Sequence, residues 1–395
     1  MNTAQAQRSG SRRDFHPRPA GTPVRDVGAA VKAACAVLAP RPPDLVLIND
    51  PQRGTDSPRI LAELRGRYAP AATRLLVATG SHRFSPTAQA AFEQPLRALG
   101  FDAIAWHDAR AADLVDLGGW RAHPWLAAAR SVLAIGSVEP HYFAGYTGAH
   151  KTLTIGCAAY ADIERNHAGA MSPACRPCHP ETSPVHQGVM TMLRALENGR
   201  RLAAINLFQI GAEIFGIAGG TPQAALDALT PQVGHTYLHT LVRPADAVIA
   251  RVTGPLACSF YQADKGIKNN EAAVRSGGAL ILDAVCPQGI GQDAFFQLLK
   301  QAPDHRSALA LVESRGYNLG DHKAARLRHL TDPARRNVHL YLVCPGLTAD
   351  DARVAGATKA ESIADALHLA GVDESAALVC DVADAGNTCL DVAAP

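Results

Sequence analysis

The sequence predicts two α/β domains with mostly parallel sheets. At 395 residues, the chain exceeds the roughly 150 residues expected of one domain. Short apolar runs typical of buried parallel strands alternate with stretches of helical character. With 47% hydrophobic and 19% charged residues, the composition is that of a folded globular protein rather than a disordered or fibrous one.

The expected elements of the first domain alternate along the chain. They are, in order, a helix at 24–38, a strand at 44–48, a helix at 60–68, a strand at 74–78, a helix at 86–99, a strand at 131–135, helices near 163–167 and 187–197, a hairpin of strands at 202–208 and 213–217, and a helix at 221–229. Polar residues follow each of the first three strands. Strand ends of this kind are where open α/β sheets bind ligands.

A second unit begins near Arg243. Its expected elements are strands at 247–251, 279–284, 339–343 and 376–382, and helices that begin at 261, 293 and 359. We therefore expect a flexible tail at 1–22, an N-terminal domain at 23–240, a C-terminal domain at 241–355, and a helix and strand at 356–395 that return to the N-terminal domain. We expect the site in the cleft between the domains.

Charge and hydropathy exclude several classes of protein. The formal net charge is +2, and Lys and Arg are scattered without interleaved aromatic residues, so we expect no nucleic-acid partner. No apolar run approaches the roughly 18–20 residues that span a bilayer, so we expect no membrane. The segment 11–15 resembles a twin-arginine export signal, but Pro17, Pro19 and Pro23 interrupt any apolar region after it. We therefore expect a cytoplasmic protein whose nine cysteines are reduced.

The stretch 138–167 concentrates groups that can do chemistry. His141, Lys151 and His167 lie among glycines, small residues and tyrosines, which is an unusual composition for a linker. Glycines let a backbone turn sharply or approach a ligand closely. The stretch therefore predicts a binding or catalytic loop.

Three familiar motifs fail on inspection. A P-loop needs Gly before its Lys, and this chain has His150 there. No Gly-x-Gly-x-x-Gly follows a strand. Cys175 and Cys178 with the next histidine have haem c spacing, but that chemistry belongs to exported proteins, so we expect a surface loop with incidental thiols.

Taken singly, the remaining candidates have ordinary explanations. Lys151 alone would be a solvated lysine, and Asp50 with Arg53 would be a structural ion pair. A lone histidine is usually a surface or core residue. That explanation is weaker for His82, His141 and His167, because they fall in Gly-rich loops or just after predicted strands.

Together the residues resemble the lactate racemase family that uses a nickel-pincer nucleotide. The resemblance is carried by the spacing of His141, Lys151 and His167, by Asp50-x-x-Arg53, by Gly80-Ser-His82-Arg83, and by Tyr261-Gln262-x-x-Lys265. It extends from about residue 44 to 388. It implies that Lys151 is covalently joined to a pyridinium-3-thioamide-5-thiocarboxylic acid mononucleotide and that His167 binds its nickel.

The resemblance also assigns the remaining roles. It implies that His82 and His141 are the catalytic acid–bases and that Arg53, Gln262 and Lys265 hold the substrate. In the same motifs, Asp50 is expected at the substrate, and Gly80 and Tyr261 at the cofactor.

The chemistry explains why such a family would use these residue types. Breaking the Cα–H bond of a 2-hydroxy acid needs more than acid–base catalysis, which supplies about 10²–10⁴-fold. The resemblance therefore implies racemisation or epimerisation by reversible hydride transfer to the cofactor, with a small-molecule 2-hydroxy acid as substrate. It also implies maturation partners: a carboxylase/hydrolase, a sulfur transferase and a nickel insertase.

Departures from the family pattern leave alternatives open. Many relatives have Gly-Gly-Arg-Lys where this chain has Gly148-Ala149-His150-Lys151, so His150 faces either the cofactor or solvent. His322 lies in a region that approaches the cofactor in relatives. One alternative function is a hydrolase with His82, His141 and His167 as a zinc triad. The other is a non-catalytic nickel-cofactor carrier.

Overall fold

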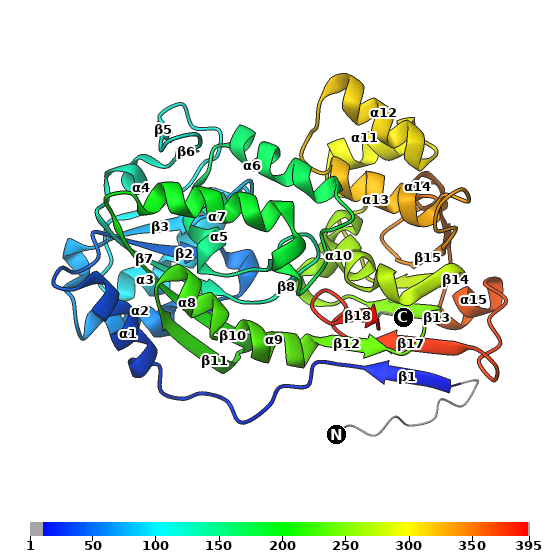
Figure 1. Ribbon diagram of the computed structural model, residues 1–395, viewed down its shortest axis with the longest axis horizontal. Helices are drawn as coiled ribbons and strands as arrows, with labels where there is room; N and C mark the ends of the chain where they lie inside the picture. Colours follow the sequence, from blue (N-terminus) through cyan, green and yellow to red (C-terminus); the bar gives the residue numbers. More distant parts are fainter. Residues whose placement is uncertain (1–10, 394–395) are drawn as a thin grey trace. The chain divides into compact units, whose positions relative to one another are not determined.

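The computed structural model describes residues 11–393, which fold into two compact α/β units (Figure 1). One unit comprises residues 19–236. The other combines the described residues before Pro19 with those from Tyr237 onward. Both units contain a six-stranded sheet that is mostly or wholly parallel, which confirms the predicted fold class. The expected cleft between the domains stays a prediction.

The sheet of the first unit has the strand order β11-β10-β7-β2-β3-β4. These strands are β11 (Glu213–Gly220), β10 (Arg201–Ile210), β7 (Ser131–Ser137), β2 (Leu45–Asn49), β3 (Arg74–Ala78) and β4 (Ile104–Trp106). Only the β10–β11 pair within this sheet is antiparallel. β2 and β7 are almost entirely buried, as expected for parallel strands covered on both faces.

Helices cover both faces of this first sheet. On one face, α1 (Gly28–Leu38), α2 (Ser57–Arg65) and α3 (Pro86–Ala98) pack their apolar residues on alternate strand residues such as Ile48 and Ile205. On the other face lie α5 (Ala149–Leu153) and α8 (Pro222–Asp227), with α7 (Pro184–Glu197) packed against α5. The remaining helices are α4 (Pro124–Ala128), α6 (Tyr160–His167) and α9 (Thr230–Tyr237).

Local sequence explains where several of these helices begin. The side chain of Asp56 accepts a hydrogen bond from the backbone N–H of Arg59 at the start of α2. Ser85 and Ser183 cap α3 and α7 in the same way, and all three helices have a proline in their first turn. Capping oxygens satisfy N–H groups that have no intrahelical partner, and proline lacks one of those groups.

The sheet of the second unit has the order β1-β17-β13-β14-β15-β16 and is entirely parallel. Its strands are β1 (Ser11–Phe15), β17 (Leu378–Val382), β13 (Ala245–Arg251), β14 (Val274–Asp283), β15 (His339–Val343) and β16 (Ala357–Lys359). Its helices are α10 (Phe260–Asn270), α11 (Asp293–Gln301), α12 (His305–Arg315), α13 (Asp321–Thr331), α14 (Ala349–Ala355) and α15 (Ile363–Leu369). Ile249, Ile281 and Val379 lie in the core between α15 and the sheet.

Two expectations about domain organisation are corrected. Residues 11–15 of the predicted flexible tail form β1, which pairs with β17; Arg12 donates a hydrogen bond to Asp381 at 2.6 Å. Residues 1–10 lie outside the described part. The strand predicted at 376–382 does not return to the first domain, because it forms β17, which pairs with β13 in the second sheet. The alternating pattern predicted β13, β14, β15 and β17 but not their partners.

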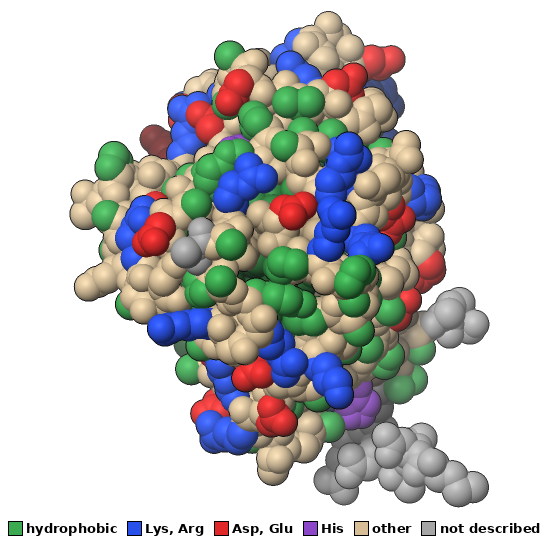
Figure 2. Space-filling view, turned by 90° about the vertical axis from the view of Figure 1, so that its left-hand side faces the viewer, with side chains coloured by type: hydrophobic (Ala, Val, Ile, Leu, Met, Phe, Trp, Pro, Cys, Tyr) green, Lys and Arg blue, Asp and Glu red, His purple; other side chains and the backbone are tan. Residues whose placement is uncertain are grey.

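The nine cysteines are all free thiols, consistent with the predicted reduced state. Among residues 11–393, no helix is both long and apolar enough to cross a membrane. On the face drawn in Figure 2, Lys and Arg side chains occur in small groups with Asp and Glu between them.

Candidate functional site

The carboxyl ends of three adjacent parallel strands carry the first group of predicted residues. β7, β2 and β3 lie side by side. Asp50 and Arg53 follow β2, His82 follows β3, and His141 lies in the short strand β8 (Pro140–His141) after β7. The expectation that successive strand ends bring these residues to one edge of a sheet is confirmed.

Asp50 and His82 form a direct pair at this edge. The Nδ1 atom of His82 lies 2.9 Å from the Oδ2 atom of the buried Asp50. The other carboxylate oxygen of Asp50 accepts a hydrogen bond from the backbone N–H of Gln52 at 2.9 Å. Asp50 therefore pairs with His82 rather than with Arg53, whose side chain is half-buried.

Gly80 joins the β3 loop to the segment after the predicted tether. Its φ of +56° favours glycine, and its N–H donates to the carbonyl of Gly156 at 2.9 Å. This contact keeps the two loops together.

The predicted tether Lys151 lies on α5, which is fixed to the sheet at two points. The backbone N–H of Ala149 donates to the Oδ1 atom of Asn206 on β10 at 2.8 Å, and Thr152 donates to the Oδ1 atom of Asn49 on β2 at 2.8 Å. Gly136 on β7 lets the backbone of α5 approach, because a Cβ there would lie 2.6 Å from the Ala149 nitrogen. Small and amide residues on the sheet thus set the position of the tether helix.

One aromatic ring contacts three of the predicted residues. The ring of Phe143 lies 4.3 Å from that of His141 and 4.9 Å from that of His167, both edge-on, measured between centroids. The Nζ atom of Lys151 lies 5.4 Å from the same centroid. Phe143 therefore brings His141, Lys151 and His167 together around one apolar surface.

His167 is the last residue of α6, and its imidazole is neutral at physiological pH. Burial, together with the nearby charge of Lys151, lowers the pKa of His167 to about 3. Its Nδ1 atom lies 3.2 Å from the side-chain oxygen of Asn166. A neutral imidazole is the form that binds a metal ion.

His150 does not face solvent. Its side chain is fully buried, and its ring lies 5.5 Å from the ring of His186 on α7. Burial, followed by the effects of His186 and Lys151, lowers the pKa of His150 well below its usual value. Within the described part of the chain, neither ring nitrogen of His150 has a hydrogen-bond partner.

Cys175 differs from the expected surface thiol, because it is buried beside Phe143, Ala170 and Val185. Cys178 is partly exposed and has a φ of +63°. Both cysteines lie in a loop as predicted, but only Cys178 is exposed to any extent.

The second group of predicted residues lies in the other unit, on α10, which follows the carboxyl end of β13. Lys265 donates from Nζ to the Oδ1 atom of Asn387 at 3.0 Å. Asn387 follows the carboxyl end of β17. Tyr261 and Gln262 are half-buried in the first turn of the helix. This unit thus also presents its predicted residues at strand ends.

Buried charged side chains lie on α10 and next to it. Lys323 on α13 donates to the carbonyl of Tyr261, and its Nζ atom lies 4.2 Å from the Tyr261 ring centroid. Asp264 is fully buried, with Lys268 and Lys323 each 3.8 Å away. Burial raises the pKa of Asp264 and lowers the pKa of Lys323 to about 8. His322 is also buried, and its Nδ1 atom lies 2.6 Å from the Tyr317 hydroxyl.

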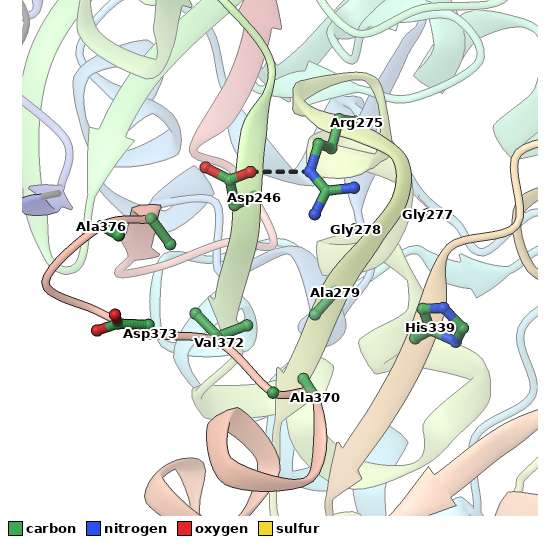
Figure 3. Close-up of a pocket in the computed structure, with 12 residues that line it drawn as sticks. Asp246, Arg275, Gly277, Gly278, Ala279, His339, Ala370, Val372, Asp373 and Ala376 are labelled. Carbon is green, nitrogen blue, oxygen red and sulfur yellow. Dashed lines mark hydrogen bonds and ion pairs between the residues drawn. The ribbon is translucent and has the colours of Figure 1, made fainter. Parts of the chain in front are cut away.

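A hollow of about 260 Å³ opens at the opposite end of the second sheet (Figure 3). Asp246 and His339, near the amino ends of β13 and β15, line it, and Arg275 donates to Asp246 at 2.8 Å. None of the predicted site residues lines this pocket. The predicted residues of this unit lie instead beyond the carboxyl ends of β13 and β17.

The described residues do not form a metal site of their own. In the range 11–393, no three His, Cys, Asp or Glu side chains are grouped closely enough to hold a metal ion. His82, His141 and His167 are therefore not arranged as a zinc triad. A metal held by His167 would need its other donors from a bound group.

Sequence reasoning missed Phe143, Asn206 and the pairing of Asp50 with His82. Phe143 lies only two residues after His141, so a large aromatic in a Gly-rich stretch was a usable signal. Asn206 lies on a strand far along the chain, and its contact with Ala149 depends on strand order, which the sequence did not reveal.

Both domains match sequence models of known protein domains. The lactate racemase N-terminal domain matches residues 45–176, and the lactate racemase C-terminal domain matches residues 241–319. Together these matches cover just over half of the chain.

Two curated proteins resemble the chain in sequence. The lactate racemase of Thermoanaerobacterium thermosaccharolyticum is 28% identical over 273 residues, which are 66% of this chain and 62% of that protein. The lactate racemase of Lactiplantibacillus plantarum is 28% identical over 268 residues, which are 64% and 61% of the two chains. The match thus spans less than two thirds of each relative.

Solved structures share the fold. The lactate racemase apoprotein from Thermoanaerobacterium thermosaccharolyticum superposes with a TM-score of 0.78 at 22% identity, covering 91% of this chain and 92% of that one. A Thermotoga maritima protein superposes with a TM-score of 0.69 at 14% identity, covering 94% and 99%. At these identities the similarity shows the fold alone.

Proposed function

We propose that this chain, which belongs to the lactate racemase family, is an isomerase that racemises or epimerises a 2-hydroxy acid. The observation that carries the proposal is the grouping of Lys151, His141 and His167 around Phe143. An acid–base, a tether and a metal ligand are the three kinds of residue that this chemistry requires of the first domain.

The residues present fit the nickel-pincer nucleotide that the family uses. Lys151 offers an amine for covalent attachment, and the low pKa of His167 keeps its imidazole in the form that binds nickel. When bound, the group would supply the hydride acceptor that no side chain provides. The absence of a three-ligand site among residues 11–393 agrees with a metal whose other donors come from the cofactor.

The histidines would handle the hydroxyl proton. His82 would accept it from one enantiomer at Nε2 while Asp50 holds Nδ1. His141 would do the same for the other enantiomer. Two acid–bases allow the planar 2-keto acid to be reprotonated at oxygen from either side.

Cations and an amide would hold the substrate carboxylate. Arg53 can bind it in a bidentate fork, and Lys265 adds a compact charge whose position is set by Asn387. Gln262, in the same turn of α10, would donate to the acid, while Gly80 and Tyr261 would contact the cofactor. The carboxylate of the substrate would thus stay in place while its Cα changes geometry.

The proposed partners follow from this chemistry. Other proteins would build the cofactor: a carboxylase/hydrolase, a sulfur transferase and a nickel insertase. The alternative of a zinc hydrolase has little support, because the three histidines are not grouped. A non-catalytic cofactor carrier would contain the same tether but turn over no hydroxy acid.

Mass spectrometry with metal analysis tests the proposal on protein co-expressed with the maturation proteins. We expect an adduct on the Lys151 peptide, nickel in equal amount, and interconversion of at least one chiral 2-hydroxy acid. Lys151→Ala should carry no adduct. Unmodified Lys151, in cells that load a known lactate racemase, would contradict the proposal. An adduct without turnover of any acid in a broad panel would favour the carrier.

A further inference from the structure

The geometry points to Phe143 as a positioning residue that holds His141 and His167 in place around Lys151, an inference that rests on the proposed function for its catalytic meaning. The ring contacts both histidines edge-on and lies beneath the Lys151 ammonium. It is 5% exposed, so these contacts are shielded from water.

The backbone of Phe143 is anchored by hydrogen bonds. Phe143 lies between β8 and β9 (Gly145–Tyr146), and its carbonyl accepts a hydrogen bond from the buried hydroxyl of Ser183. Ser183 also accepts from the His186 N–H at 3.0 Å, so the start of α7 anchors the loop. Gly145 permits the turn, because its φ is +72° and a Cβ there would lie 2.5 Å from the Pro180 nitrogen.

The neighbours of Phe143 complete its support. Tyr142 packs edge-on against it at 4.7 Å, and the pair lies in a buried cluster with Ala144, Ala170 and Val185. Tyr142 also stacks on His141, with 5.5 Å between ring centroids. From its place in this cluster, Phe143 contacts all three predicted groups.

An aromatic contact suits this task for a chemical reason. Edge-to-face packing orients an imidazole without itself forming a hydrogen bond to a ring nitrogen. The same ring attracts an ammonium through its face. A hydrogen-bonding neighbour would instead compete with the ligands.

The first test uses the apoprotein and needs no cofactor. Diethyl pyrocarbonate modification is followed on the His141 and His167 peptides, with the exposed His235 as internal reference. Phe143→Leu keeps an apolar side chain but removes the ring. We therefore expect the modification rates of His141 and His167, each relative to that of His235, to rise about threefold, as expected for loss of one aromatic contact. Phe143→Tyr keeps the ring and should preserve the wild-type rates.

A matched control separates positioning from general loosening. Phe215→Leu makes the same substitution on β11 in the same domain, where the ring packs on Phe208 at 6.3 Å. Phe215→Leu should leave the modification rates of His141 and His167 unchanged. Equal rates in the wild type and Phe143→Leu would overturn the inference, as would a rise equally large in Phe215→Leu.

The second test uses co-expressed, loaded protein. We expect Phe143→Leu to bind less nickel per Lys151 adduct and to lose about tenfold in kcat, because small displacements of reacting groups are costly. Phe143→Tyr should restore both. A wild-type nickel ratio and kcat in Phe143→Leu would overturn the inference. If the wild type carries no adduct, the proposed function fails, and the apoprotein comparison still decides the role of Phe143.

Discussion

The Nδ1 atom of His82 lies 2.9 Å from the Oδ2 atom of Asp50, across the ends of two neighbouring parallel strands. An ionised carboxylate can only accept a hydrogen bond, so a contact with one favours the imidazole tautomer that carries its proton on Nδ1. In that tautomer Nε2 carries the lone pair. The pair therefore presents His82 as a base with a fixed tautomer and orientation.

Replacing Asp50 with Asn should impair turnover more than it impairs attachment of the cofactor to Lys151. The amide can donate as well as accept, so it no longer fixes the tautomer of His82. We expect kcat to fall by about 10²-fold, the contribution typical of a positioned acid–base, with the Lys151 adduct retained. Chiral chromatography and peptide mass spectrometry measure the two quantities. Asp116→Asn, at the exposed end of the short strand β5 (Val115–Asp116), serves as the control. An unchanged kcat in Asp50→Asn would contradict the assignment.

Gly136→Ala should displace the tether helix. The new Cβ would lie 2.6 Å from the backbone nitrogen of Ala149, which cannot move aside as a flexible side chain could. We expect a loss of about 1–3 kcal/mol in unfolding free energy and a fall in adduct on Lys151. Urea denaturation and peptide mass spectrometry measure the two effects.

Gly211→Ala is the matched control for that variant. Its φ of +59° makes alanine strained, but its Cβ would meet nothing within 4 Å. We expect the unfolding free energy to fall by about 1–2 kcal/mol, with the wild-type amount of adduct on Lys151. If both variants load equally well, the position of α5 does not depend on Gly136.

The sequence predicted most strands of the two six-stranded sheets because each is a short apolar run followed by polar residues. β3 and β15 were predicted with their observed bounds, and β2 and β7 to within two residues. Residues 11–15 contain three charged side chains and gave no such signal. β1 is an edge strand, stabilised by pairing with β17 and by ion pairs that no local pattern reveals.

The candidate site was predictable to the level of the strand ends and no further. His82, His141 and Lys151 were predicted as site residues because spacing and Gly-rich loops are local features. The contacts of Phe143 with His167, and of Asn206 with Ala149, join segments whose proximity depends on packing and strand order. Position in the chain alone could not reveal them.

His107 should make stability depend on pH. Its side chain is 3% exposed, and burial lowers its pKa to about 4, against a usual value near 6.5. The unfolded chain therefore binds a proton before the folded one, and stability falls as pH decreases between about 6.5 and 4. The full shift in the pKa of His107 is worth about 3 kcal/mol of unfolding free energy, at about 1.4 kcal/mol per pKa unit.

The His107→Gln variant isolates this effect from the other buried histidines. We expect its unfolding free energy to fall less than that of the wild type between pH 6.8 and pH 5, by about 1–2 kcal/mol. Urea denaturation at the two pH values measures the difference. His235→Gln, at an exposed position, should follow the wild type. Identical slopes for His107→Gln and the wild type would show that His107 is not buried as described.

Asp381→Asn should destabilise the second unit. Arg251 contacts the Asp381 carboxylate through two hydrogen bonds of 2.7 and 2.9 Å, and Arg12 adds a third of 2.6 Å. Burial alone would raise the pKa of Asp381, but these hydrogen bonds and charges lower it below its usual value. The network therefore stabilises the fold above the usual carboxyl pKa near 4, and this contribution is lost as pH falls through the lowered value.

The expected loss in Asp381→Asn is about 2–3 kcal/mol at pH 7, because two arginines lose a largely buried partner. A larger fraction of the wild type is protonated at Asp381 at pH 3 than at pH 7, so the difference in stability between the two proteins should be smaller at pH 3. Guanidinium denaturation at both pH values measures it. Asp350→Asn removes an exposed ion pair with Arg353 and should change stability little. Equal stability of Asp381→Asn and the wild type at pH 7 would mean that Arg12 and β1 do not contribute to the fold through this carboxylate.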